Sequence, residues 1–145
     1  MRRLIIIGAM MLLAASGCSS DTVSVASPVR GLTPGRMEVA INGRSAVDQR
    51  DLACMQIGSE TMATTGAGNS MVRAVVNGGH NLRTVSVQFT NFAGFTGSYW
   101  ADLQGEAQAE LIGSSTFVIS GKADGFFIDH PVDNTSSDFT VKFAC

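Results

Sequence analysis

Three cysteines carry the most distinctive chemistry of this 145-residue chain, because a thiol can be acylated, oxidised to a disulfide or bound to a metal. They are Cys18, Cys54 and Cys145. Cys18 directly follows a hydrophobic stretch at the amino terminus, whereas Cys54 lies within the body of the chain and Cys145 is its last residue. These different surroundings predict different fates for the three sulfur atoms.

Cys18 follows the small residues Ala15-Ser16-Gly17, which resemble a bacterial lipobox. Arg2 and Arg3 precede 12 apolar or small residues, Leu4 to Ala15, which reach about 18 Å as a helix and fall short of a ~30 Å hydrocarbon core. This pattern is typical of a secretory signal rather than of a permanent membrane span. We therefore expect cleavage before Cys18 and fatty acylation of its sulfur, with palmitate among the chains attached. The alternative is an ordinary secreted protein in which Cys18 has no special role.

Cys54 and Cys145 are expected to form a disulfide, because an exported domain meets an oxidising compartment and these two thiols remain once Cys18 carries lipid. The bond would close a loop of 92 residues, counted inclusively. We expect no metal site and no cofactor: His80 and His130 are the only histidines, they lie 50 positions apart, and the sequence contains no Cys-x-x-Cys pair.

The composition divides the chain into three regions. Residues 1–17 are predicted to be a lipoprotein signal peptide, residues 18–36 a flexible tether rich in Ser, Thr and Pro, and residues 37–145 a single β-rich domain. Only 15% of the residues are charged, which argues against a nucleic-acid partner. Without Arg2 and Arg3 the chain keeps 8 basic against 12 acidic residues, so we expect no attraction to anionic headgroups through net charge.

From Met37 onward apolar residues recur with a period of two, which predicts β-strands. Asn42-Gly43 is a strong hairpin signal after the first strand. The region 101–111 also suits a helix by propensity, but its alternation and flanking glycines favour a strand. Seven or eight short strands predict a small antiparallel β-sandwich, with a barrel as the alternative. The expected strand segments are 37–41, 52–57, 71–76, 85–89, 107–111, 117–123 and 139–145.

The sequence contains none of the common catalytic motifs, such as Gly-x-Ser-x-Gly or His-Glu-x-x-His. Asp129 and His130 are neighbours, but no nucleophile accompanies them, so we expect no enzymatic activity. One cluster remains as a candidate apolar pocket or contact patch for a lipid or a partner, and its alternative role is to fill the core. It consists of Phe89, Phe92, Phe95, Tyr99 and Trp100.

Several segments, taken in their order and spacing, resemble the mycobacterial 19 kDa lipoprotein antigen family. They are the lipobox cysteine with its hydroxyl-rich tether, Met37–Gly43, Cys54, Asn91–Tyr99, Phe117–Gly125 and the closing Phe139–Cys145. The tether is shorter and poorer in threonine than the family pattern.

The resemblance implies a non-enzymatic envelope lipoprotein on the extracytoplasmic face of the cell membrane. Its lipid at Cys18 would be the membrane link, and a host receptor or an envelope component its partner. It also implies the Cys54–Cys145 disulfide. The alternative function is a carrier or chaperone for an apolar molecule such as a lipid, with the Phe89–Trp100 region as the wall of its pocket.

Overall fold

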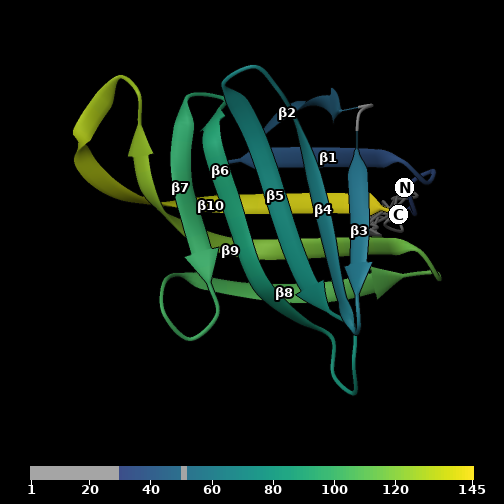
Figure 1. Ribbon diagram of the computed structural model, residues 1–145. Helices are drawn as coiled ribbons and strands as arrows, with labels where there is room; N and C mark the ends of the chain where they lie inside the picture. Colours follow the sequence, from purple (N-terminus) through teal and green to yellow (C-terminus); the bar gives the residue numbers. More distant parts are fainter. Residues whose placement is uncertain (1–29, 50–51) are drawn as a thin grey trace, which may run out of the picture.

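The computed structural model describes residues 30–49 and 52–145, which form ten β-strands and no helix (Figure 1). In chain order they are β1 (Arg36–Ile41), β2 (Arg44–Gln49), β3 (Ala53–Ile57), β4 (Glu60–Ala67), β5 (Ser70–Asn77), β6 (Arg83–Phe92), β7 (Phe95–Trp100), β8 (Glu106–Ile112), β9 (Thr116–Phe127) and β10 (His130–Ala144). Every pairing is antiparallel, in the order β2-β1-β10-β9-β7-β6-β5-β4-β3, with β8 beside β9. The two ends of this path do not pair within the described residues, so the sheet is open. The predicted all-β antiparallel sandwich is confirmed, and the barrel alternative is wrong.

The sheet folds over on itself into two layers that cross at a steep angle (Figure 1). Strands β3 to β7 form one layer, and β2, β1, β10, β9 and β8 form the other. Strand β9 belongs to both. Its first part, Thr116–Lys122, pairs with β8, and its last residues, Asp124–Phe127, pair with β7 in the opposite layer. A strand that changes layer in this way is the usual means of turning a corner between orthogonal sheets.

Glycine makes the corner possible. Gly125 of β9 faces Gly97 of β7 directly across the strand pair. A Cβ atom added at Gly125 would collide with the Thr96 carbonyl oxygen and with the Cα of Gly97. The two backbones therefore approach more closely here than any side chain permits.

Three strands of the structure were not among the strand segments predicted from the sequence. They are β2, β4 and β7, and β10 also begins at His130 rather than at Phe139. β4 reads Glu-Thr-Met-Ala-Thr-Thr-Gly-Ala, with small or hydroxylated residues in place of bulky alternating ones. β7 contains a glycine, and the first half of β10 is polar. These segments become strands because they form backbone hydrogen bonds with neighbouring strands. Their own sequence pattern is too weak to predict a strand.

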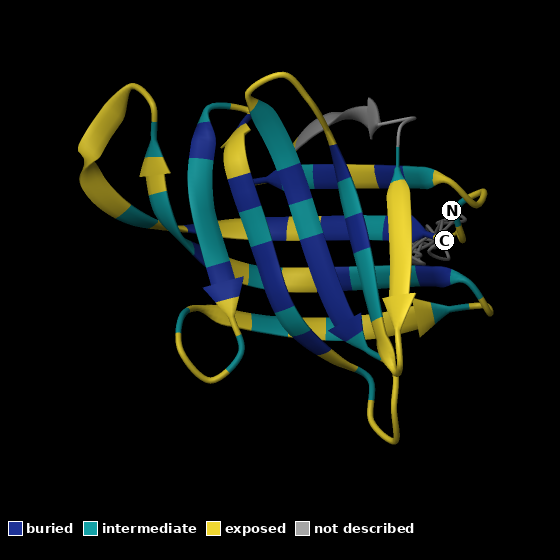
Figure 2. Cartoon of the chain, viewed as in Figure 1, coloured by how far each residue is buried: buried dark blue, intermediate teal, exposed yellow. Residues whose placement is uncertain are grey.

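The core fills the space between the layers, and both layers present alternate residues to it (Figure 2). The turn Asn42-Gly43 has positive φ at both residues (49° and 74°), as the expected tight hairpin requires, and it brings β2 back alongside β1. The buried residues of the core cluster are Met37, Val39, Ile41, Ala63, Val72, Ala74, Val76, Val87, Phe89, Phe92, Phe95, Tyr99, Ile119, Ala123, Phe139, Val141 and Phe143.

The expected disulfide joins Cys54 to Cys145, with the two Cα atoms 6.0 Å apart. Cys54 lies on β3, the edge strand of one layer, and Cys145 directly follows β10 of the other layer. The bond therefore connects the two layers far from the corner at which β9 already joins them. The prediction of this pairing is confirmed.

The last part of the expected tether already contacts the domain. The backbone N–H of Leu32 donates to Thr116 Oγ1 at 2.9 Å, and that of Gly35 donates to the carbonyl of Ala144 at 2.8 Å. The amino-terminal end of the described chain consequently lies beside the carboxyl terminus (Figure 1). The signal peptide and residues 18–29 of the tether lie outside the described residues and stay predictions.

Two buried hydroxyl groups are exceptions to the apolar core. Among the described residues, Thr65 Oγ1 and Thr84 Oγ1 are buried without a hydrogen-bond partner. Thr116 is equally buried, but its Oγ1 accepts the hydrogen bond from Leu32. A buried hydroxyl without a partner has lost its hydrogen bonds to water and has no protein hydrogen bond to replace them, so it destabilises the fold.

We expect loss of the disulfide to destabilise the domain substantially. The double variant Cys54→Ser/Cys145→Ser should lose about 2 to 4 kcal/mol of unfolding free energy, because its unfolded chain is no longer cross-linked. The melting temperature should fall by roughly 10 °C in thermal denaturation. Reduced wild-type protein is the matched control and should melt with the variant. Equal melting temperatures for the oxidised and reduced wild type would contradict a structural disulfide.

We expect Thr65→Val to stabilise the domain by about 1 kcal/mol, because a methyl group of similar size replaces a buried hydroxyl that has no partner. Chemical denaturation should show a higher midpoint with an unchanged slope. Thr116→Val is the matched control. It removes a hydroxyl that does accept a hydrogen bond, and should lower the midpoint. A Thr65→Val protein less stable than wild type would show that this hydroxyl is satisfied in solution.

Candidate functional site

The five aromatic residues expected to form a pocket or patch are divided between two places. Phe89, Phe92, Phe95 and Tyr99 are buried in the core. Phe89 is the centre of this group, with its ring centroid 5.8 Å from that of Phe95, 6.5 Å from Phe92 and 5.4 Å from Phe139. These separations are those of rings in mutual contact. These four residues therefore fill the core, which was the alternative role expected for the cluster. Trp100 remains partly exposed.

The local backbone explains this division. Side chains alternate along β7, so Tyr99 points into the core and Trp100 points to the outer face. Phe92 lies three positions after Phe89 and would face outward in a regular strand. The β6–β7 register shifts between Phe89 and Phe92, and Asn91 has a positive φ of 42° in this irregular segment. The irregularity returns Phe92 to the core.

The outer face of the β3–β7 layer carries a row of residues that we call the apolar stripe: Met55, Met62, Val75 and Trp100, with Ser86 between the last two. Each is the registered partner of the next across the sheet. Met55 faces Met62, Met62 faces Val75, Val75 faces Ser86, and Ser86 faces Trp100. Since strands lie about 4.8 Å apart, the stripe spans roughly 19 Å across five strands.

The stripe is distinct from the core. Val75 is buried, yet it does not belong to the core cluster, whose β5 members are Val72, Ala74 and Val76. Sequence reasoning missed the stripe because its four apolar members come from four different strands and only the register brings them together. The one local signal was the run Ala74-Val75-Val76, in which consecutive apolar residues must point to opposite faces of a strand.

The outer face of the other layer is charged instead. Glu106 of β8, Lys122 of β9 and Asp138 of β10 lie side by side in register. Lys122 Nζ donates to Asp138 Oδ1 at 2.8 Å, and this hydrogen bond, together with the charge of Asp138, raises the pKa of Lys122 above its ordinary value of 10.5. Both side chains are largely exposed, so their ion pair stabilises the fold little.

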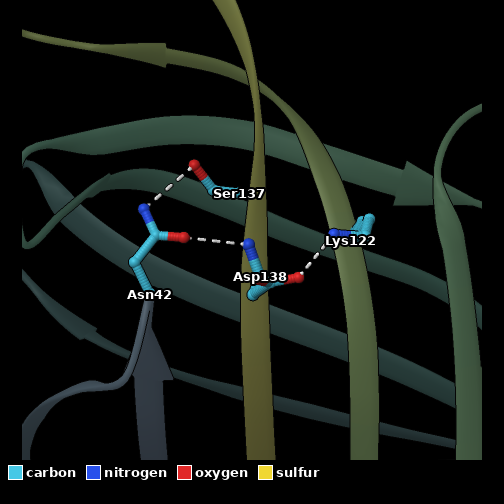
Figure 3. A network of polar contacts seen from close by, with 4 residues as sticks. All are labelled: Asn42, Lys122, Ser137 and Asp138. Carbon is cyan, nitrogen blue, oxygen red and sulfur yellow. Dashed lines mark hydrogen bonds and ion pairs between the residues drawn. The ribbon is translucent and has the colours of Figure 1, made fainter.

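Asn42 connects this charged row to β1 (Figure 3). Its Oδ1 accepts from the backbone N–H of Asp138 at 3.0 Å, and its Nδ2 donates to Ser137 Oγ at 3.4 Å. The registered pairing of β1 with β10 ends at Ile41 and Phe139, and the side chain of Asn42 accepts from the next backbone N–H of β10, that of Asp138. A shallow, open depression of about 500 Å³ lies over the charged row. We assign the Asn42 network a structural role.

The remaining candidate groups for chemistry are dispersed in the described part of the chain. His80 and His130 are both exposed, and His130 lies at the start of β10 beside the tip of the β9–β10 hairpin. Within residues 30–49 and 52–145, no three His, Cys, Asp or Glu side chains gather closely enough to hold a metal ion. No helix in this part of the chain is long and apolar enough to cross a membrane. Cys18 lies outside the described residues, so its acylation stays a prediction.

Comparison with known proteins agrees with the resemblance found in the sequence. The sequence profile of the family described as Mycobacterium 19 kDa lipoprotein antigen matches residues 30–145, which include all ten strands and the disulfide. A protein of Mycobacterium avium subsp. hominissuis (strain TH135) with the name "Putative lipoprotein" is 28% identical over 129 residues, covering 88% of this chain and 83% of the relative. On this match, which covers most of the chain, the protein belongs to the mycobacterial 19 kDa lipoprotein antigen family.

Proposed function

We propose that this protein is a lipid-anchored lipoprotein of the cell envelope. Cys18 carries the fatty acyl chains, and the β-sandwich stands on the extracytoplasmic face of the cell membrane. The observation that carries this proposal is the family match over residues 30–145, which lies downstream of the lipobox-like segment Ala15-Ser16-Gly17-Cys18. Two or three acyl chains attach a protein durably, whereas one gives marginal binding.

The disulfide supports an exported location. Cys54 and Cys145 are both exposed, so reductants of the cytosol would reach the disulfide readily. A bond that holds the two layers together is retained where the surroundings are oxidising. The domain is therefore suited to the space outside the cytoplasm.

The placement of polar groups supports a binding or structural role rather than catalysis. Lys122 and Asp138 are engaged with each other on an open surface, and His130 stands exposed on a hairpin. Catalytic groups normally lie in a cleft that excludes water and shifts their pKa values. We propose that the domain acts through its surfaces, in contacts within the envelope or with host cells.

The carrier alternative has less support. It requires Phe89, Phe92 and Phe95 to line an accessible space, but these rings are buried against one another and against Phe139. Opening such a space would separate core contacts and expose apolar surface, which is costly. The surface role therefore accounts better for the aromatic cluster.

We expect Cys18→Ala to release the protein from membranes, because the variant has no sulfur to acylate. Cell fractionation should move the protein from the membrane pellet to the soluble fraction. Intact mass of the native protein should show a chain that begins at Cys18 and carries fatty acyl groups. The matched control is Cys54→Ser/Cys145→Ser, which removes the other two thiols and should stay in the membrane fraction. Retention of the Cys18→Ala protein in membranes would disprove the anchor.

A further inference from the structure

We propose that the outer face of the β3–β7 layer rests on the lipid bilayer to which the chain is anchored, with the two ends of the apolar stripe in contact with the membrane surface. This inference rests on the proposed anchor at Cys18. One contact consists of Met55 and Ile57 on β3, and the other of Trp100 and the adjoining Leu103. The occupant of this face is thus a lipid surface.

The two ends of the stripe expose large apolar side chains. Met55 is 56% exposed and Ile57 66%, whereas Trp100 is 40% exposed and Leu103, in the turn after β7, is 86% exposed. Met55 and Ile57 point to the same face because they lie two positions apart on one strand. Tryptophan favours the boundary between lipid headgroups and acyl chains, since its ring is apolar and its indole N–H can still reach a polar partner.

Charge distinguishes this face from the opposite one. The registered outward residues of β3 to β7 include three charged ones, namely Arg73 beside the stripe and Glu60 and Arg83 on either side of Asn77. Arg83 forms an ion pair of 3.7 Å with Asp102 in the turn after β7. The outward rows of the other layer carry Glu38, Lys142, Glu110, Glu106, Lys122 and Asp138. A face approaching lipid must shed water from its polar groups, and shedding it from charges is expensive. The β3–β7 face carries fewer charges than the other face, so it approaches a bilayer at a lower cost.

The covalent connection supports a membrane as the occupant. Arg30 follows Cys18 by 12 positions, a chain length that spans at most about 40 Å. The amino-terminal segment is held beside Ala144, the disulfide joins the next residue, Cys145, to Cys54, and Cys54 adjoins Met55. One end of the stripe therefore lies close to where the anchored segment leaves the domain.

The size of the exposed surface argues against a second copy or a soluble protein. The four exposed side chains offer on the order of a few hundred Å². A stable protein interface needs about 800 Å² from each partner. A domain already tethered to a membrane meets the lipid at an effective concentration in the millimolar range, so weak apolar contacts suffice to orient it.

Trp100 is the only tryptophan of the chain, so its fluorescence reports on this face alone. The native acylated protein is placed in phosphatidylcholine vesicles whose acyl chains are either ordinary or brominated, and flotation measures attachment to the vesicles. We expect Trp100 emission to shift to shorter wavelength relative to the soluble Cys18→Ala protein. We also expect it to lose intensity in the brominated vesicles, because bromine quenches an indole that it touches.

Substitutions away from Trp100 test whether the whole face makes contact. Met55→Gln/Ile57→Gln removes the apolar contact at the far end of the stripe and should reduce quenching without changing flotation. Val132→Gln is the matched control, since Val132 is 91% exposed but lies on the β9–β10 hairpin, away from the stripe. It should leave quenching unchanged. Equal quenching in all three proteins would overturn a contact made by the face.

The outcomes separate this inference from the proposed anchor. If the acylated protein floats with the vesicles but Trp100 is not quenched, the anchor stands and the contact of the face is disproved. If it does not float, the anchor is disproved, and the oriented contact that depends on it falls as well. A concentration-dependent shift of Trp100 emission in the Cys18→Ala protein without vesicles would identify a second copy on this face and overturn the membrane contact.

Discussion

The fold depends on one strand that pairs in two layers. β9 pairs with β8 through its first part and with β7 through its last residues, while β10 pairs along most of its length, so a single continuous sheet becomes a sandwich. The turn requires close approach of two backbones at Gly97 and Gly125, where a side chain has no room. Without this corner the inward rows of the two layers would not face each other, and rings such as Phe89 and Phe139 would lie on open surfaces.

The disulfide is the second connection between the two layers, at the opposite end of the sandwich from the β9 corner. β3 is an edge strand whose five residues are all exposed, so little apolar packing holds it to the other layer. The covalent link from Cys54 to Cys145 provides that attachment. Because the same link lies beside the segment that leads back to Cys18, the part of the domain nearest the proposed anchor is also its most firmly cross-linked part.

The two outer faces of this small domain differ in their surface chemistry. One carries an alternation of acidic and basic residues that suits water, and the other carries the apolar stripe. In the part of the chain that the structure describes, the difference between the two faces is the main functional information in the fold. The proposed envelope role and the proposed membrane contact both follow from where the chain is attached and from which face can shed water.

Local patterns in the sequence determined the strands with strong alternation, such as Met37–Ile41 and the final Phe139–Cys145, the Asn42-Gly43 turn and the pairing of the two remaining cysteines. The strands and the turn are readable because side-chain alternation and turn geometry involve residues that are neighbours in the chain. The cysteine pairing is readable because two thiols remain in an exported domain once Cys18 carries lipid. Trp100 was singled out, but as a member of a cluster whose other four rings turned inward. Only the tertiary structure decided that Phe92 returns to the core at an irregular strand, that β2, β4 and β7 exist, and that Met55, Met62, Val75 and Trp100 form one row. The physical reason is that strand pairing is made by backbone hydrogen bonds, which are the same for every residue type and join segments that lie far apart in the sequence.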